Sequence, residues 1–306
     1  MPEPHADHLQ SWLSMLHATR LVAVLEPEIP WRPGPELAVT VRGAFGLAVR
    51  EVACVQPGGD CAACREAPTC LVPGWFEGRG HDLRPFSLRV AWPVGELVGR
   101  ERPIRATWTF FGPVPRPSLV VEALHRMARA GLGPLRVPHR VVHAAAEGLG
   151  ASVALVQTTP SPIWPEPAPL AQVVSLPADV RGARVDLVTR LSFGKRLGGR
   201  EPEPSDIVRL ALARVRHLAQ HQGVSLPVRW PDPREAEGRW LYQRRAAAQR
   251  WSGRQRQEVW LDGWLGCAEF GPEIAPFVDL LAFSEIAQIG RDTTAGLGVV
   301  QVGWAN

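Results

Sequence analysis

A proline-rich segment divides this chain into two halves of similar length. Five prolines fall within residues 159–169, and proline at that density excludes both a helix and a central strand. The segment therefore predicts a linker. Because 306 residues is about twice the usual domain length, we expect two domains, residues 1–158 and residues 170–306, each long enough to bury its own core.

The two halves show the same alternation of strand-like and helical patterns. Apolar side chains in residues 41–52 recur at i, i+3, i+4, i+7 and i+8, which places them on one face of a helix. In the first half we predict strand 20–25, helix 41–52, strands 86–91 and 104–110, a helix that Ser118 caps and Gly131 ends, and a last strand at 140–142 or 151–157. In the second half we predict strand 183–193, a helix that Ser205 caps, a hairpin of residues 240–251 and 257–270, helix 274–289 and strand 299–302.

The resulting order, βαββαβ in each half, is that of the ferredoxin-like unit, which is also the architecture of RNA-recognition domains. We therefore predict an α+β protein made of two tandem ferredoxin-like domains. A cysteine-bearing insert at residues 54–70 interrupts the first of them.

Four cysteines in this insert follow the spacing C-x6-C-x2-C-x5-C: Cys54, Cys61, Cys64 and Cys70. Four thiolates in one short loop suit a tetrahedral zinc ion, which would replace the hydrophobic core that so short a segment lacks. An iron–sulfur cluster and unliganded or redox-active cysteines are the alternatives. The predicted zinc is structural, because four thiolates leave no open position for a catalytic water.

Nearly all positive charge in the chain is carried by arginine. Lys195 is the sole lysine, the net charge is +4, and the isoelectric point is about 9.1. Guanidinium groups pair with phosphate through two hydrogen bonds and stack on bases, but a GC-rich genome gives the same bias, so only clusters of arginines indicate RNA. No secretory signal and no membrane-length apolar run is visible, and we expect a cytoplasmic protein with no membrane partner.

The strongest cluster lies near the C-terminus, where arginines alternate with polar residues and tryptophan. We predict that its members bind RNA, together with Arg42 and with the glycine loop of residues 290–298; the set is Arg250, Arg254, Gln255, Arg256, Arg291, Gly296 and Gly298. The alternatives are a solvated strand face and an ordinary tight turn. A second set of cations is expected to coat the outside of the helix that begins at Ser205: Arg209, Arg214, Arg216 and His217.

Residues 250–302 resemble the C-terminal signature of the Cas-six family, the CRISPR pre-crRNA-processing endoribonucleases of the RAMP superfamily. The family reads S-x-R-Q, G-x-x-G, an apolar helix and G-x-x-T-T-x-G-x-G. The matching residues are Ser252, Arg254 and Gln255; Gly263 and Gly266; residues 277–289; and Gly290, Thr293, Thr294, Gly296 and Gly298. Residues 42–50 look like the family's first helix.

The resemblance implies a nuclease that cleaves CRISPR repeat RNA without a divalent metal and leaves a 2′,3′-cyclic phosphate. Such a reaction needs a base, an acid and a cation that stabilises the developing charge, and histidine is a suitable base near neutral pH. In the family the catalytic histidine, where one is used, follows the first helix, and His81 occupies that place, with Arg79 and Arg84 as candidate cations. His139 and His143 are the fallback.

Two other functions remain open at this point. A non-catalytic RAMP subunit would hold guide RNA among the other Cas proteins of an effector complex, and the tyrosine that some members carry in the first helix is indeed absent, since Gly46 stands there. A zinc-stabilised nucleic-acid-binding protein unrelated to CRISPR would make the C-terminal match accidental. The histidine in the expected loop favours the enzyme.

Overall fold

The computed structural model describes residues 12–56, 61–77, 84–155, 164–197, 200–252 and 257–305. It gives the backbone alone for residues 195–196 and 250–252. The chain forms two compact units: an N-terminal unit, Ala18–Ala168, and a C-terminal unit, Pro169–Asn306, which also includes the first segment, Met1–His17. Each unit is described by itself below.

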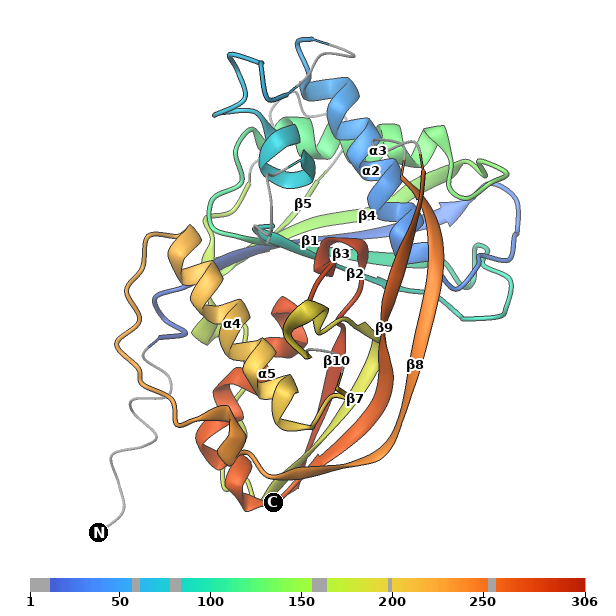
Figure 1. The fold of residues 1–306 in the computed structure, drawn as a ribbon. Helices are drawn as coiled ribbons and strands as arrows, with labels where there is room; N and C mark the ends of the chain where they lie inside the picture. The colour runs from blue at the N-terminus through green and yellow to red at the C-terminus, as the bar shows by residue number, and fades with distance from the viewer. Residues whose placement is uncertain are drawn as a thin grey trace. The chain divides into compact units, whose positions relative to one another are not determined.

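The N-terminal unit is a ferredoxin-like domain (Figure 1). Its elements are β1 (His17–Pro27), α2 (Leu37–Ala53), β2 (Phe86–Ala91), β3 (Ile104–Phe111), α3 (Pro117–Ala130), β4 (His139–Gly148), β5 (Ala151–Ala154) and the short β6 (Ala168–Pro169). The strand order is β2-β3-β1-β4-β5, with β6 paired to β1. Both candidate last strands of the first half therefore form, as β4 and β5.

Aromatic side chains fill the core between the helices and the sheet of this unit. Phe45 of α2 lies 5.0 Å from Trp108 of β3, and Trp75 stacks 4.8 Å from Phe110, measured between ring centroids. Each large apolar side chain buried in this way contributes about 1.5–3 kcal/mol. On the opposite face of the sheet Val22, Thr109 and Ala145 are buried as well, whereas Arg89, Arg105 and His143 are exposed.

The C-terminal unit repeats the same fold (Figure 1). Its main elements are β7 (Gly182–Leu191), α4 (Ser205–His221), β8 (Gly238–Ser252), β9 (Gln257–Phe270), α5 (Val278–Ala287) and β10 (Val300–Ala305). The strand order is β10-β7-β9-β8, with antiparallel neighbours throughout. The predicted fold of two tandem ferredoxin-like domains is confirmed, and so is the long hairpin, formed by β8 and β9.

A buried carboxylate ties two irregular segments to α5. The carboxylate of Asp279 accepts hydrogen bonds from the indole N–H groups of Trp12 and Trp230 and from the backbone N–H of Leu280. Trp12 also packs against Phe283, with 5.4 Å between ring centroids. Burial raises the pKa of Asp279 to about 6, in spite of these three hydrogen-bond donors.

Four local predictions were wrong. Neither Ser118 nor Ser205 caps its helix: α3 begins at Pro117 and α4 follows Pro204, without a side-chain cap in either case. The predicted helix 274–289 is divided into a 3-10 segment, Pro272–Phe277, and α5, because Pro276 interrupts it. Arg214 does not coat the outside of α4, since only 1% of it is exposed.

No helix in the described part of the chain is both long enough and apolar enough to cross a membrane.

Candidate nucleic-acid interface

The glycine loop between α5 and β10 requires its glycines. Gly290, Gly296 and Gly298 have φ of 81°, 78° and 71°, a region that side chains disfavour. A Cβ at Gly298 would lie 1.8 Å from the carbonyl oxygen of Ile289, and one at Gly290 would lie 2.7 Å from that of Ser192. Both contacts are with backbone, which cannot move aside, so these positions exclude every other residue.

The loop is attached to a bulge in β7. The register between β7 and β9 shifts between Leu187 and Leu191, and in the gap β7 bonds to the loop instead of to its neighbouring strand. The N–H of Gly298 donates to the carbonyl of Arg190 at 2.9 Å, and the N–H of Val299 donates to the Thr189 hydroxyl at 3.0 Å. The bulge thereby places Arg190 beside the loop.

Several backbone N–H groups of the glycine loop donate hydrogen bonds to carbonyls of the same loop. The N–H groups of Ala295, Gly296 and Leu297 donate to carbonyls of the loop itself, and residues 293–300 are buried. Arg291, by contrast, is exposed, and its Cδ lies 3.1 Å from where a Cβ of Gly194 would be. The glycines therefore give the loop its shape, and Arg291 offers the charge that a phosphate would contact.

The G-x-x-G pair of β9 allows two neighbouring strands to approach closely. A Cβ at Gly263 would lie 2.9 Å from the Leu191 carbonyl oxygen of β7, and a Cβ at Gly266 would lie 2.6 Å from the Tyr242 carbonyl oxygen of β8. Both partners lie where the strand register shifts. The two glycines of β9 thus hold the β8–β9 hairpin close to the bulge of β7, to which the glycine loop is attached.

The hairpin presents cations and an aromatic ring to solvent. Arg244 is exposed and forms no ion pair among the described residues, whereas Arg245 pairs with Asp262 and lowers the pKa of that carboxyl. Trp260 is 63% exposed. Arg250 lies on β8 opposite Val259, and Arg254, Gln255 and Arg256 lie outside the described residues.

The open face of the N-terminal sheet carries a row of basic residues that the sequence reasoning missed. Val24 of β1 pairs with Arg105 of β3 on one side and with His143 of β4 on the other, so the three share one face at about 4.8 Å per strand. Arg89 of β2 lies opposite Thr107, in the next row. All three basic residues are exposed, and Arg89 and Arg105 form no ion pair among the residues described. The sequence signal was the alternation of residues 86–91 and 104–110.

The predicted catalytic residues lie at the edge of what the structure describes. Arg79 and His81 fall outside the described residues, and Arg84 is half-buried, two residues before β2 begins. Arg42 lies on α2 with its guanidinium carbon 5.5 Å from the centroid of the Phe76 ring. Gly46 lies one turn further along α2 and faces the same ring, since a Cβ there would lie 3.1 Å from a Phe76 ring carbon, and any side chain at this position would press on the ring.

The two fallback histidines, His139 and His143, differ in solvent exposure. His139 is 2% exposed, its Nδ1 lies 2.7 Å from the Val137 carbonyl oxygen, and burial lowers its pKa. It is a core residue of this unit. His143 is exposed on the sheet face beside Val24, so it is the member of the pair that can meet a ligand.

The four clustered cysteines are half-buried and form no disulfide in the described part of the chain. The N–H of Cys54 donates to the Arg50 carbonyl at the end of α2, and Arg50 Nη2 lies 3.7 Å from Cys61 Sγ. Across the described ranges, no three His, Cys, Asp or Glu side chains are grouped as a metal ligand set. The zinc site stays a prediction from spacing.

Family models match both halves of the chain. Residues 185–300 match the model described as CRISPR-associated endoribonuclease Cas6, and residues 16–167 match a model described as an N-terminal domain. No curated protein matches the chain in sequence.

Solved structures of Cas6 proteins share the fold. A Cas6 product complex is 17% identical with a TM-score of 0.52, over 94% of this chain and 99% of that chain. Thermus thermophilus Cas6 is 14% identical with a TM-score of 0.51, over the same shares. A partial Cas6-RT-Cas1–Cas2 complex is 12% identical with a TM-score of 0.51, over 95% of this chain and 46% of that chain.

At these identities the structural likeness establishes the tandem fold, and the sequence match to Cas6 covers residues 185–300. The matched residues run from β7 to the start of β10 and include the glycine loop, its attachment to β7 and both glycines of β9. Residues 185–300 of the chain are therefore similar to the CRISPR-associated endoribonuclease Cas6 family, and the chain as a whole has the tandem fold of Cas6 proteins.

Proposed function

We propose that this protein binds CRISPR repeat RNA and cleaves it by attack of a ribose 2′-hydroxyl on the adjacent phosphate. The 2′-oxygen forms a bond to phosphorus as the bond to the 5′-oxygen breaks. A base takes the proton of the 2′-hydroxyl and an acid supplies one to the leaving oxygen. The products are a 2′,3′-cyclic phosphate and a 5′-hydroxyl, and no divalent metal takes part.

His81 is the proposed base, and Arg79 and Arg84 are the proposed cations that stabilise the phosphorane charge. The support is their place in the chain: a polar, glycine-rich stretch that follows α2 and the segment Pro73–Glu77 and ends at Arg84, two residues before β2 begins. An arginine is a poor proton donor at neutral pH, so the acid is a separate group, and the exposed His143 is the candidate in the same unit.

The proposed RNA-binding residues divide into two groups. Arg250 lies near the end of β8, and Arg254, Gln255 and Arg256 come between β8 and β9 in the sequence. Arg291 stands on the glycine loop, whose shape depends on Gly296 and Gly298. Arg42 belongs to the N-terminal unit and extends the set to α2. The single observation that carries this proposal is the Cas6 match over residues 185–300, because it includes the loop whose glycines the geometry requires.

The proposal includes a structural zinc ion held by Cys54, Cys61, Cys64 and Cys70, supported by their spacing. It also places the protein in the cytoplasm, with other Cas proteins of an effector complex as partners. The Cas6-RT-Cas1–Cas2 complex supports the second point, since a protein of the same fold assembles there with Cas proteins.

The test is incubation of the purified protein with the repeat RNA of its own CRISPR array in EDTA, beside His81→Ala and the control His17→Ala. His17 is a half-buried residue at the start of β1. We expect wild type and His17→Ala to cleave and His81→Ala to bind without cleaving, and mass spectrometry to find a cyclic phosphate end.

Each other result has a distinct meaning. Cleavage by all three proteins would keep the nuclease and remove His81 as its base. Cleavage that needs added magnesium would contradict the metal-independent mechanism. Binding by all three without cleavage would favour a guide-RNA-holding subunit.

A further inference from the structure

Gln288 connects the end of α5 to the glycine loop. Its backbone N–H donates to the Ser284 carbonyl at 3.0 Å and so completes the last turn of the helix. The next residue, Ile289, donates its N–H to the Gly298 carbonyl at 3.0 Å, and the loop begins at Gly290. The backbone conformation of Gln288 therefore sets the direction in which the loop leaves α5.

The backbone of Gln288 has a conformation that suits glycine. Its φ is 55° and its ψ is 154°. Arg116 and Asp292 also have positive φ, but their ψ values of 62° and 30° place them in the left-handed helical region, which residues other than glycine do visit. The angles of Gln288 lie close to a region that is essentially reserved for glycine. Glutamine at this position therefore strains the backbone, and glycine would not.

The side chain of Gln288 is buried without using its amide oxygen. Only 1% of the residue is exposed, and among the described residues Oε1 accepts no hydrogen bond. A buried oxygen without a donor is unfavourable, so polar bonding through Oε1 does not explain the glutamine. What its side chain contributes is packing, since its neighbours Ala287 and Ile289 are fully buried too. Strained residues persist only where the surrounding structure holds them, and here the buried side chain holds Gln288.

The exposed part of the loop lies between two buried segments. Arg291 and Asp292 are exposed, whereas residues 287–289 before them and residues 293–300 after them are buried. The backbone N–H of Arg291 donates to the Ser192 carbonyl at 3.3 Å. Gln288 belongs to the first buried segment, three residues before Arg291, so the position of that guanidinium depends on how Gln288 is held.

We propose that Gln288 is a positioning residue for RNA binding: its buried side chain anchors the start of the glycine loop and so holds Arg291 where a phosphate of the RNA meets it. Gln288 itself does not touch the RNA, because it is buried. The backbone strain is the cost of this anchor, as at other sites that are shaped before their ligand binds. The inference rests on the proposed function, since it presumes RNA as the ligand.

Two substitutions of Gln288 separate its side chain from its backbone. Gln288→Gly removes the anchor and relieves the backbone, whereas Gln288→Met keeps an unbranched buried chain of similar length and removes the amide. Asp179→Gly is the backbone control, because Asp179 also has positive φ, 52°, but is exposed and outside the loop. Thermal unfolding and the binding of repeat RNA across a salt series are measured for all of them.

We expect Gln288→Gly to melt at a temperature no lower than that of wild type and yet to bind the repeat RNA about tenfold more weakly. Its salt slope should fall by about 0.7, the share of one phosphate contact. Gln288→Met should bind as wild type does, because the packing is kept. Asp179→Gly should bind at least as tightly as wild type.

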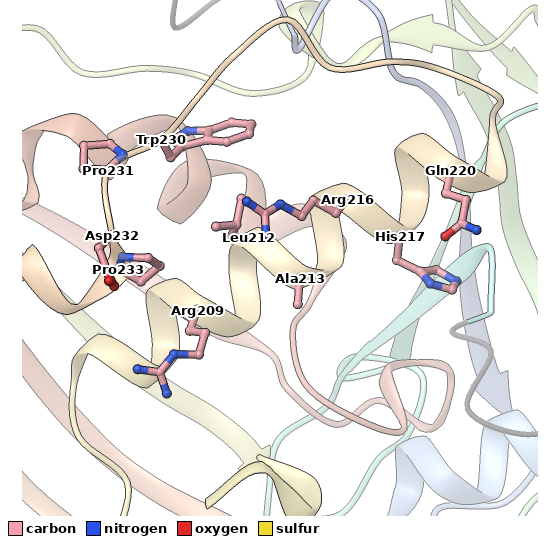
Figure 2. Close-up of a pocket in the computed structure, with 10 residues that line it drawn as sticks. All are labelled: Arg209, Leu212, Ala213, Arg216, His217, Gln220, Trp230, Pro231, Asp232 and Pro233. Carbon is pink, nitrogen blue, oxygen red and sulfur yellow. The ribbon is translucent and has the colours of Figure 1, made fainter.

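A double substitution tests whether Gln288 acts through Arg291. Arg291→Ala should weaken binding to a similar extent, and adding Gln288→Gly to it should weaken binding little further, because both remove the same contact. Arg216→Ala is the matched control for charge. Arg216 is exposed on α4, where it lines a cavity to which the glycine loop contributes no residue (Figure 2), so any effect of its loss should add in full to that of Gln288→Gly.

Unchanged RNA binding by Gln288→Gly, or full additivity of Gln288→Gly and Arg291→Ala, would overturn the inference. Equal weakening by Gln288→Met and Gln288→Gly would also overturn it, since the amide and not the packing would then be required. A Gln288→Gly protein that melts far below wild type would assign the residue to the stability of the fold instead. Each of these results, with a wild type that binds the repeat, rejects this inference alone, whereas a wild type that binds no repeat RNA would reject the proposed function.

Discussion

The N–H of Gly298 donates to the carbonyl of Arg190 at 2.9 Å, and this bond attaches the glycine loop to the bulge of β7. Ile289 completes the attachment, since its N–H donates to the Gly298 carbonyl at 3.0 Å. Loop and strand therefore form one structural unit, and the position of Arg291 depends on it.

Gly298→Ala should destabilise the C-terminal unit by about 2 kcal/mol or more, because it adds a Cβ at positive φ and against the Ile289 backbone. Gly303→Ala on β10 is the matched control, since a Cβ there meets nothing within 4 Å. Urea unfolding measures both. Equal stability of the two variants would show that the loop relaxes around the new methyl group.

The stability of the protein should depend on pH through Asp279. Its pKa is raised from 3.8 to about 6 by burial, so between these values the unfolded state releases its proton while the folded state retains it. The free energy of unfolding should therefore fall by about 2 kcal/mol as the pH rises from 4 to 6, out of about 3 kcal/mol over the whole titration. Below that window this contribution is fully present, and above it the contribution is lost.

Asp279→Asn should remove this part of the pH dependence, whereas Asp179→Asn, at an exposed turn position, should keep it. Urea unfolding at several pH values compares the three proteins. A slope in Asp279→Asn equal to that of wild type would assign the effect to another group.

Arg105→Ala should weaken RNA binding several-fold and lower its salt dependence, because Arg105 stands exposed in the row with Val24 and His143 and phosphate contacts release counterions. Arg129→Ala, on the exposed face of α3 near Glu122, is the control. Binding by fluorescence anisotropy across a salt series distinguishes them. If the two substitutions have the same effect, the open sheet face is not part of the RNA interface.

The cysteine cluster should hold one zinc ion per chain, and Cys64→Ser should lose the metal and lower the melting temperature. Cys267→Ser, in the buried part of β9, should retain it. Elemental analysis of the purified proteins measures the zinc content per chain. A metal-free wild type with an unchanged melting temperature after chelation would contradict the zinc prediction.

The order of helices and strands could be predicted because each element carries its own local pattern, as α2 does from Val41 to Val49. Helix starts were predicted less well, since Pro117 and Pro204, rather than the serines beside them, mark where α3 and α4 begin. Arg214 was misplaced because its charge suggested the surface, whereas its position on α4 faces the core.

Which residues become neighbours in the candidate site depends on the order of the strands in the sheet, and the local sequence pattern does not reveal that order. Arg105 and His143 become neighbours of Val24 only because β1 lies between β3 and β4. Trp12 reaches Asp279 across almost the whole chain. The glycine loop was the exception, because three glycines at fixed spacing indicate a backbone conformation that other residues rarely adopt.

The central claim is cleavage by a ribose 2′-hydroxyl, and it is tested most directly with a repeat RNA that carries one 2′-deoxynucleotide at the cleaved position. The account predicts that the protein binds this RNA as tightly as the unmodified repeat and leaves it intact. Cleavage of the deoxy-substituted RNA at the same phosphate would contradict the mechanism, because no 2′-oxygen would be present to attack.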